Sequence, residues 1–399
     1  MAKAVSDQMP QTLSHGKVIT KYGHIQEAAL SPMVELFEAG HPLPDENGLA
    51  ATGNVLDLLK SADANTLVLC LISGGGSALF VDPCPPVTLA EKQEVTTLLL
   101  KAGAGIEELN AVRKHISLVK GGRLAELAYP ARLISLILSD VIGDRLDVIA
   151  SGPTAPDDST FSDALEVIRK YGLPGRIPAS VMKLLDWGAA GRLPETPKQG
   201  NPIFDQVENI IVGSNGKATE AARKTALEMG FDTTVLSSEL QGEARVIAKE
   251  LAAKAKAVAR SSLALPSSIR PICLICGGET TVTVSGEGKG GRNTELALAF
   301  ALEVEGLPGI TLLSAGTDGT DGPTDAAGAF ADGETAGCAR RGGHDPEKYL
   351  ANNDSYNFFR ETGGLFVTGP TGTNVMDLQI ILIEPAGMSN QGGVFNEQQ

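Results

Sequence analysis

The stretch Leu67-Val-Leu-Cys-Leu-Ile-Ser-Gly-Gly-Gly-Ser-Ala-Leu-Phe80 decides the fold. Residues 67–72 are all apolar, whereas a strand with one face in water would alternate apolar and polar residues. We therefore predict a fully buried strand of a parallel sheet at 67–72. The strand stops at Gly74–Gly76, where no Cβ separates the backbone from a ligand. The loop Ser73–Ser77 either binds an oxyanion or is a tight turn into a helix, and its own residues do not decide between the two.

Length and composition favour an α/β protein of two domains. The chain has 399 residues, of which 42% are hydrophobic and 4% aromatic, with 46 glycines; it can therefore bury a large aliphatic core and needs many turns. The net charge of −15 argues against broad binding to nucleic acid or to an anionic membrane, because the mean field would repel both. A small anionic substrate still fits where a few basic side chains converge.

Cysteine usage and the absence of a leader predict a cytoplasmic protein. The five cysteines are odd in number, which fits free thiols in a reducing compartment and not a disulfide framework. Cys273-Leu-Ile-Cys276 has the spacing of a redox motif, but it lies in an apolar run, so we interpret both thiols as buried core residues. The sequence shows no signal peptide and no apolar run of about 18 residues.

Strand and helix patterns alternate over most of the chain, with helical spacing clear at 89–101. This alternation predicts right-handed crossovers and largely parallel sheets flanked by helices, in two domains. The proline- and glycine-rich stretch 174–202 is the predicted boundary region. It gives an N-terminal α/β domain over 1–205 and a second α/β region over 206–385. The polar segment 386–399 is predicted to be a flexible tail.

Polar or glycine-rich turns follow several predicted strands, where ligands of open α/β sheets usually bind. The segment 110–123 holds four cations and a histidine in an acidic protein. Arg113, Ser117 and Lys120 would share one face if this segment is a helix. That face is either an anion-binding surface or a solvated basic face. Gly121-Gly122 favours the first, because a merely solvated helix has no use for it.

Two further turns are candidates for catalysis. Asp140 follows the predicted strand 131–138 and either holds a metal, takes a hydroxyl proton or caps a helix. Arg292 and Asn293 end the glycine-rich loop 286–291. If this loop is flexible, it could swing the Arg292 guanidinium onto a transferring phosphoryl group; the alternative is a hairpin turn followed by an Asn N-cap.

The loop 314–328 is dense in aspartate and glycine. Asp318, Asp321 and Asp325 are spaced i, i+3 and i+7 and could bind Mg²⁺ or contact substrate hydroxyls, although their spacing does not fit an EF-hand. Asx-turns are the alternative explanation. A weaker candidate, 368–374, has the glycines and hydroxyls of a backbone nest.

Taken together, these motifs resemble the class II glycerate 2-kinase family, whose C-terminal part is called the MOFRL domain, here at about 270–385. The matching segments follow the family order along the chain. They are Leu-Ile-Ser-Gly-Gly-Gly-Ser-Ala-Leu (71–79), Asn-x-Val-Arg-Lys-His-x-Ser-x-x-Lys-Gly-Gly-Arg (110–123), Leu-Ser-Asp-Val-x-Gly-Asp (138–144), Ile-Ala-Ser-Gly-Pro-Thr (149–154), Gly-Gly-Glu-Thr (277–280), Gly-Gly-Arg-Asn-x-Glu (290–295), Ala-Gly-Thr-Asp-Gly-Thr-Asp-Gly-Pro-Thr-Asp-Ala-Ala-Gly (315–328) and Thr-Gly-Pro-Thr-Gly-Thr-Asn-Val (368–375).

The resemblance implies that ATP, with Mg²⁺, phosphorylates D-glycerate at its 2-hydroxyl to give 2-phosphoglycerate. It implies a larger Rossmann-like N-terminal domain, a smaller MOFRL domain and an active site in the cleft between them. Asp140 and Arg292 match positions proposed for catalysis in the family, and Asp318, Asp321 and Asp325 are the expected metal ligands. The residues expected to bind substrate or phosphate are Ser73, Gly74, Gly75, Gly76, Ser77, Arg113, Lys120, Asn293, Thr317 and Thr371. No partner beyond the two small molecules is expected, and the protein is expected to be a monomer or homodimer.

The sequence departs from the family pattern at its start. The family usually has an active-site lysine in a Gly-Lys-Ala segment after a first strand, shortly before a Met-Ala-Lys-Ala helix. The sequence begins with Met1-Ala-Lys-Ala4, and Lys3 matches the later lysine. We therefore expect either a start assigned too late or a form with impaired catalysis and an exposed strand edge.

Two rival functions stay open from the sequence. A hydroxypyruvate reductase would need Gly-x-Gly-x-x-Gly between a strand and a helix, and the glycines at 286–291 have the wrong spacing. A catalytically weak sugar-acid-binding homologue has only the missing lysine in its favour.

Overall fold

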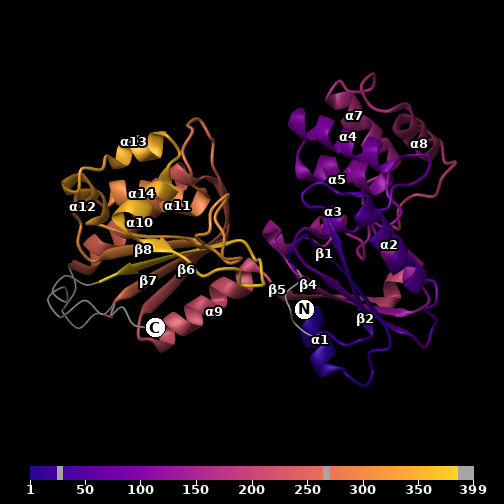
Figure 1. Cartoon of the computed structure of the whole chain (residues 1–399), viewed down its shortest axis with the longest axis horizontal. Coiled ribbons are helices and arrows are strands. Elements are labelled where there is room, and N and C mark those ends of the chain that lie inside the picture. The colour runs from indigo at the N-terminus through magenta and orange to yellow at the C-terminus, as the bar shows by residue number, and fades with distance from the viewer. Residues whose placement is uncertain (25–29, 264–269, 385–399) are drawn as a thin grey trace. The chain divides into compact units, whose positions relative to one another are not determined.

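The chain forms two compact units, which Figure 1 shows as a computed structural model. Each unit has its own β-structure and its own apolar core. The residues described are 1–24, 30–263 and 270–384, so the predicted tail at 386–399 lies outside them. The first unit comprises Met1–Ser139 and Asp144–Val212, and the second comprises Asp140–Gly143 and Gly213–Gln399.

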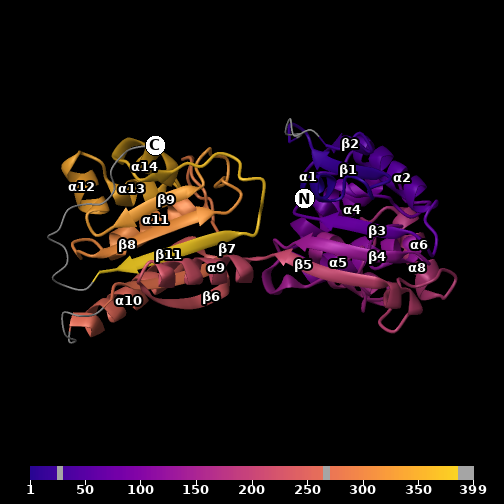
Figure 2. The same ribbon diagram turned by 90° about the horizontal axis from the view of Figure 1, so that it is seen from below.

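Two small sheets form the frame of the first unit (Figure 2). β1 (Gly16–Lys21) pairs in parallel with β2 (Val34–Ala39). β4 (Arg132–Leu138) lies between β3 (Leu67–Ile72) and β5 (Val207–Gly213), and β3 runs parallel to β4. These strands confirm the α/β class. They also confirm that a strand of a parallel pair precedes the glycine loop.

Two expectations about these strands need correction. β3 is half-buried and not fully buried: Leu67 at its start is 49% exposed, because among the described strands β3 is paired along one edge only. β5 was expected to open the second domain, but it completes the sheet of the first unit. The first unit therefore extends through Val212 and not to 205.

A second layer of the first unit is made of helices packed on one another. Its core joins buried side chains of α4 (Leu89–Lys101), α5 (Ile106–His115), α7 (Phe161–Lys170) and α8 (Ala179–Ala189). Thr88 is the N-cap residue of α4, and its side chain forms a capping box with that of Glu91. Because α8 contributes Val181 and Leu184 to this core, the stretch 174–202 is part of the unit and not a linker. The remaining elements of the unit are α1 (Ala2–Gln8), α2 (Glu46–Leu59), α3 (Gly76–Leu79), α6 (Arg123–Ala128) and the 3₁₀ turns η2 (Ile149–Ser151) and η3 (Pro202–Gln206). The 3₁₀ turn η1 (Ile142–Asp144) lies where the chain passes from the second unit back to the first.

The second unit is built on one sheet in the order β10-β9-β8-β11-β7-β6. β6 and β7 pair in parallel, and the other four pairings are antiparallel. The sheet is thus mixed and not largely parallel. β11, the last of the described strands, lies between β7 and β8, and the connection from β8 to β9 contains no helix. The strands are β6 (Asp232–Glu243), β7 (Ile272–Thr281), β8 (Ile310–Gly316), β9 (Gly328–Asp332), β10 (Leu365–Phe366) and β11 (Asp377–Ile383).

Helices cover both faces of this sheet (Figure 1). Alternate residues of β7 face opposite sides: Leu274 and Cys276 pack with α10 and α11, whereas Cys273 and Ile275 pack with α9. The two cysteines are buried free thiols on opposite faces, so their interpretation as core residues is confirmed. The helices are α9 (Asn215–Glu228), α10 (Ala244–Leu263), α11 (Arg292–Glu303), α12 (Thr335–Arg341), α13 (Pro346–Ala351) and α14 (Ser355–Thr362).

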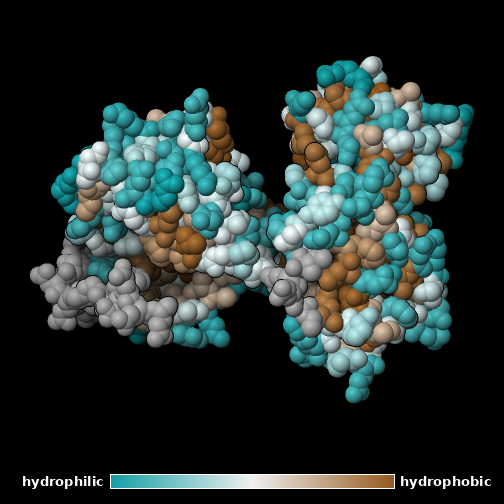
Figure 3. Space-filling model, in the orientation of Figure 1, coloured by the Kyte–Doolittle hydropathy of each residue, from teal (hydrophilic) through white to brown (hydrophobic). Residues whose placement is uncertain are grey.

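Most of the surface that can be seen in one view is hydrophilic. On the face drawn in Figure 3, hydrophilic residues predominate and apolar patches are smaller. Within the described parts of the chain, no helix is long and apolar enough to cross a membrane.

The contact between α7 and α8 gives a first testable prediction. A Cβ added at Gly188 would lie 2.2 Å from Cγ of Phe161, which is 1% exposed. We expect Gly188→Ala to lower the free energy of unfolding by about 1–3 kcal/mol, because the buried ring has to move. The measurement is denaturant unfolding of the full chain.

Gly53→Ala is the matched control. Gly53 lies inside α2, is exposed, and a Cβ there would meet nothing within 4 Å. The same substitution should therefore raise the free energy of unfolding by about 0.5–1 kcal/mol, through helix propensity. Equal effects at the two glycines would contradict the packing of α8 on Phe161.

Candidate active site

The loop Ser73–Ser77 packs against the segment that contains Ala150 and Ser151. Gly75 has a φ of 81°, and α3 begins at the next residue. A Cβ at Gly76 would lie 3.1 Å from Cβ of Ala150. The Oγ of Ser77 lies 2.9 Å from that of Ser151, which donates to Oδ1 of Asn110 at 3.1 Å. The glycine loop is therefore part of a polar network, which a simple strand-to-helix turn would not require.

The supporting loop is itself in a strained conformation. Ala150 and Ser151 have φ values of 51° and 63°, a left-handed region that costs about 1–3 kcal/mol for residues other than glycine. The amides of Gly121 and Gly122 donate to the carbonyl oxygens of Ser151 and Gly152, at 3.0 and 2.7 Å. Strain of this kind persists where surrounding contacts enforce it, and it is concentrated at functional sites.

The basic segment 110–123 is not one helix. α5 ends at His115, and Gly121 and Gly122 have φ values of 58° and 81°, so the expectation that Arg113 and Lys120 share a helix face was wrong. Both still converge, because the chain turns back between them. Lys120 is 1% exposed, and its Nζ donates to the carbonyl oxygen of Ala150 at 3.3 Å. Burial, then the charges of Lys92 and Arg113, lower the pKa of Lys120.

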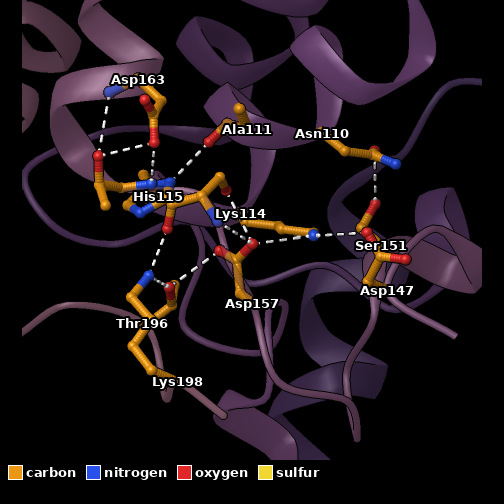
Figure 4. A network of polar contacts seen from close by, with 12 residues as sticks. Asn110, Ala111, Lys114, His115, Asp147, Ser151, Asp157, Asp163, Thr196 and Lys198 are labelled. Atoms are coloured by element: carbon orange, nitrogen blue, oxygen red, sulfur yellow. Dashed lines mark hydrogen bonds and ion pairs between the residues drawn. The ribbon is translucent and has the colours of Figure 1, made fainter.

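Lys114 and His115 have structural partners instead (Figure 4). Nζ of Lys114 lies 3.0 Å from Oδ1 of Asp157, and both side chains are at least 95% buried. His115 lies 3.0 Å from Glu195 through Nε2. Asp157 also accepts from Thr196 at 2.9 Å. These two basic residues are therefore held by acids of the same unit.

In the second unit, the predicted catalytic residue Arg292 is the first residue of α11. Its Nε and Nη2 donate to the two carboxylate oxygens of Asp377, at 2.6 and 2.9 Å. Its Nη1 lies 2.8 Å from Oε1 of Glu279. Burial alone lowers the pKa of Arg292, but its hydrogen bonds and the charges of Asp377 and Glu279 outweigh burial and raise it. The side chain is 32% exposed, so this fixed, charged side chain is only partly buried.

Acidic side chains surround this guanidinium. Partial burial raises the pKa of Glu279, and the charges of Asp377, Asp140 and Asp318 raise it further while Arg292 lowers it. Asp140 counts with the second unit by its contacts. The structure therefore brings the two predicted catalytic residues, Asp140 and Arg292, to the same group of charges.

Asp321 has a structural role at the start of the same helix. Its Oδ1 accepts from the amide of Asn293 at 2.9 Å, and its Oδ2 accepts from the amide and hydroxyl of Thr294, both at 2.8 Å. It takes the place of an N-cap side chain, because the residue before Arg292 is a glycine. Burial raises the pKa of Asp321, and these donors lower it in part.

The three aspartates expected to bind one metal ion are not brought together as a ligand set. Asp321 uses both oxygens on α11, and Asp325 accepts from the hydroxyl of Tyr356 at 2.7 Å. Oδ1 of Asp318 accepts from the amide of Thr320, an Asx-turn of the kind weighed for this loop. Among the described residues, no group of three or more acidic, histidine or cysteine side chains is placed to hold a metal.

The loop 286–291 is packed and not free to swing. Gly288 donates its amide to the carbonyl oxygen of Asn352 at 2.9 Å, and Lys289 donates to Oδ1 of Asp354 at 2.8 Å. A Cβ at Gly288 would lie 2.4 Å from Cβ of Asp354. The glycines are therefore needed for close approach to 352–355, and Arg292 is prepositioned by its carboxylates.

Thr317 and Thr371 connect the loop after β8 to the loop before β11 in the second unit. Thr371 donates its hydroxyl to the carbonyl oxygen of Thr317 at 2.6 Å, and its amide donates to that of Asp318 at 3.2 Å. Both threonines line a pocket of about 190 Å³. Its other walls are mostly apolar, including Leu378 and Phe366. An apolar pocket with a few polar groups is typical of small-molecule sites.

Comparisons with known proteins agree with this arrangement. Two family models match: Domain of unknown function (DUF4147) over 1–186 and the MOFRL family over 272–377. The chain is 49% identical to the D-glycerate 2-kinase of Thermotoga maritima, over 96% of this chain and 88% of that protein. The chain belongs to the glycerate 2-kinase family. A putative hydroxypyruvate reductase of Agrobacterium vitis is 40% identical, over 96% of this chain and 84% of that protein.

A solved structure extends the family likeness to the fold. The crystal structure of glycerate kinase from Thermotoga maritima superposes with a TM-score of 0.88 at 48% identity, covering 96% of this chain and 88% of that one. The two-domain α/β architecture of this family member is therefore confirmed. Of the predicted site residues, Arg292 is bound by Asp377 and Glu279 and stays partly exposed, whereas Asp321 is buried and caps α11.

The buried Lys114–Asp157 pair gives a second prediction. Asp157→Asn keeps the shape and removes the charge, so we expect the free energy of unfolding to fall by about 3 kcal/mol, because buried Lys114 keeps only the more distant and more exposed carboxylate of Asp147, at 3.7 Å. Burial alone raises the pKa of Asp157, but Lys114 and the hydrogen bonds of Ser159 and Thr196 lower it on balance. A carboxyl group whose pKa is lowered in the folded state stabilises the fold above about pH 4, and this stabilisation is lost as the pH falls further. The two proteins should therefore converge in stability in acid.

Asp57→Asn is its control. Asp57 pairs with Lys60 at 2.7 Å, but both side chains are 73% exposed. Its removal should change the free energy of unfolding by less than about 0.5 kcal/mol. Similar losses for the two variants, measured by denaturant unfolding, would contradict a special role for the buried pair.

Proposed function

We propose that this chain is a glycerate 2-kinase, which transfers the γ-phosphoryl group of ATP to the 2-hydroxyl of D-glycerate to give 2-phosphoglycerate. The observation that carries the proposal is the guanidinium of Arg292, which Asp377 and Glu279 fix in place. It occurs in a chain related over nearly its full length to a D-glycerate 2-kinase.

The chemistry of phosphoryl transfer suits this geometry. Such a reaction needs little covalent work from the protein, and depends on positioning and on neutralising charge. Asp377 accepts from Nε and Nη2 along one edge of the Arg292 guanidinium. Nη1 and Nη2 each carry two hydrogens, so each keeps one N–H beyond its bond to Glu279 or Asp377. These donors would stabilise the oxygens of the phosphoryl group during transfer. Asp140 would orient the accepting hydroxyl and take its proton.

Anion binding would be shared by the other predicted residues. In the first unit, the amides at Ser73–Ser77 with Arg113 and Lys120 would bind anionic groups of the acid or the nucleotide. In the second unit, Asn293, Thr317 and Thr371 would contact the second ligand. The pocket of about 190 Å³ beside the two threonines has the apolar lining that a nucleotide base needs.

ATP is the donor that we propose, together with Mg²⁺. The residues present do not supply a three-aspartate cage, because Asp321 and Asp325 are engaged elsewhere. Mg²⁺ is commonly held by substrate phosphates and only one or two carboxylates, for which Asp318 is the candidate. We further propose a cytoplasmic enzyme without macromolecular partners, acting as a monomer or homodimer.

The rival activity is hydroxypyruvate reduction, the name carried by one relative. A dinucleotide needs open backbone at a glycine-rich turn for its pyrophosphate. The space beside the glycines of 286–291 is instead occupied by Asn352, Asp354 and Ser355. This packing favours the kinase over the reductase.

A coupled assay of ADP release tests the proposal. Arg292→Ala should lower kcat by about 10³-fold or more, the range for arginines that stabilise a transferring phosphoryl group. Arg292→Lys should also lose most activity, because an ammonium lacks the planar fork that Asp377 orients.

Arg341→Ala is the control, because Arg341 is an exposed arginine on α12 of the same unit, and its kcat should stay unchanged. An unaltered kcat for Arg292→Ala would remove Arg292 from the mechanism. Oxidation of NADH with hydroxypyruvate, without ADP release from glycerate and ATP, would establish the reductase. Glycerate binding with neither activity would identify a binding homologue.

A further inference from the structure

Lys92 is a charged residue at a core position of α4. The neighbouring residues of its helical stripe, Leu89, Val95 and Leu99, are buried in the first unit. Lys92 is only 4% exposed, and its Nζ has no hydrogen-bond partner among the described residues. A buried ammonium without a partner is strongly unfavourable. Packing alone would be satisfied better by leucine or methionine.

Two more cations, Lys120 and Arg113, belong to the same group of charges as Lys92, and none of the three forms an ion pair with a described acid. Lys120 reaches only a carbonyl oxygen, that of Ala150, within the described structure. Arg113 on α5 makes no hydrogen bond or ion pair with the residues described. Burial and then the charge of Arg113 lower the pKa of Lys92 to about 7, and Asp82 alone acts in the opposite direction. No ion pair within 4.0 Å joins Asp82 to Lys92 in the described part of the chain.

The neighbouring Lys114 shows that this arrangement is specific. Lys114 is buried to the same degree as Lys92, at 4% exposed, but it lies 3.0 Å from the carboxylate of Asp157. The same unit thus pairs one buried lysine with an acid and leaves Lys92 and Lys120 without one. Asp82 acts on Lys92 without pairing with it, so an anion bound next to these lysines would stabilise their charged forms.

Lys120 connects this group of cations to the region of the glycine loop. Nζ of Lys120 contacts the carbonyl oxygen of Ala150, and Gly76 lies against the Cβ of the same residue. Ser77 and Ser151 meet 2.9 Å apart at the same place. Loop amides, hydroxyls and cations therefore converge on one region of the first unit.

We propose that Lys92, Arg113 and Lys120 form a buried pocket for one oxyanion, a carboxylate or a phosphoryl group, and that Lys92 takes up a proton from solvent when the anion binds. The pocket rests on the proposed function, since it assigns an end of the acid or of the nucleotide to the first unit. Lys92 was not foreseen from the sequence, although a lysine in the apolar stripe of an amphipathic helix was a visible signal.

Proton uptake gives the pocket a definite pH dependence. An anion favours the ammonium form of Lys92, so its pKa is higher in the complex than in the free protein. The affinity is then greatest below the free pKa of about 7 and falls as the pH rises above it. Arg113, Lys120 and Asp82 are the charged groups around Lys92. Burial also lowers the pKa of Lys120, so a bound anion favours the ammonium form of both lysines.

The test is calorimetric binding to the full-length Lys92→Met variant. D-glycerate and the non-hydrolysable β,γ-imido analogue of ATP are titrated separately at about pH 6 and about pH 8, in buffers of different ionisation enthalpy. We expect the variant to bind one of the two ligands about tenfold more weakly, or weaker still, because a hydrogen bond to a charged group is lost. Proton uptake, which the wild type shows at about pH 8, should become smaller in the variant, because Lys92 no longer contributes to it. Weaker glycerate binding assigns the pocket to the carboxylate, and weaker analogue binding assigns it to the phosphoryl groups.

The matched control is Lys101→Met, an exposed lysine on the same helix, which should bind both ligands as the wild type does. Thermal unfolding keeps the test independent of folding: Lys92→Met should be as stable as the wild type or more so, because replacing a buried charge by an apolar side chain of similar volume is often stabilising.

Wild-type affinities and proton uptake in a folded Lys92→Met variant would overturn the pocket, as would a wild type that binds neither ligand. A wild type that binds both ligands with proton uptake, but forms no 2-phosphoglycerate, would overturn the kinase proposal and leave the pocket standing.

Discussion

The buried carboxylate of Asp321 is the constraint on which the second unit depends. α11 is buried along most of its length, so the free amides at its N-terminus cannot turn to water. Asp321, 1% exposed, accepts from two of these amides and from the hydroxyl of Thr294. Because Arg292 is the first residue of α11, the same capping interaction that satisfies the helix also sets where the guanidinium begins. Asp377 and Glu279 then fix its direction.

Glycine serves this arrangement through close approach and not through flexibility. A Cβ at Gly291 would lie 2.3 Å from Cγ of Asp321, and one at Gly290 would lie 2.3 Å from Oγ of Ser355. The loop before α11 is therefore tightly packed. A stabilising arginine that is already in place loses little conformational entropy during the reaction, which is the general advantage of preorganised electrostatics.

The first unit separates its buried cations into two kinds. Lys114 has Asp157 as its partner, and this pair stabilises the layer of helices. Lys92 and Lys120 have no such partner among the described residues, and Lys120 lies beside a strained loop at Ala150 and the glycine turn. A protein of net charge −15 can still bind small anions in this way, because a local group of desolvated cations outweighs the mean field at short range.

The sequence by itself determined the class of fold, the strand at 67–72, the helix at 89–101 and the family, because periodicity of burial and turn chemistry are local properties of the chain. It also placed Arg292 at the start of a helix. Only the tertiary structure decided that β11 enters between β7 and β8, and that Arg292 pairs with Asp377, 85 positions away. It also decided that Asp321 caps a helix and that Lys92 joins Arg113 and Lys120. Charges meet through contacts between distant segments, and no local pattern records which of them will be buried together.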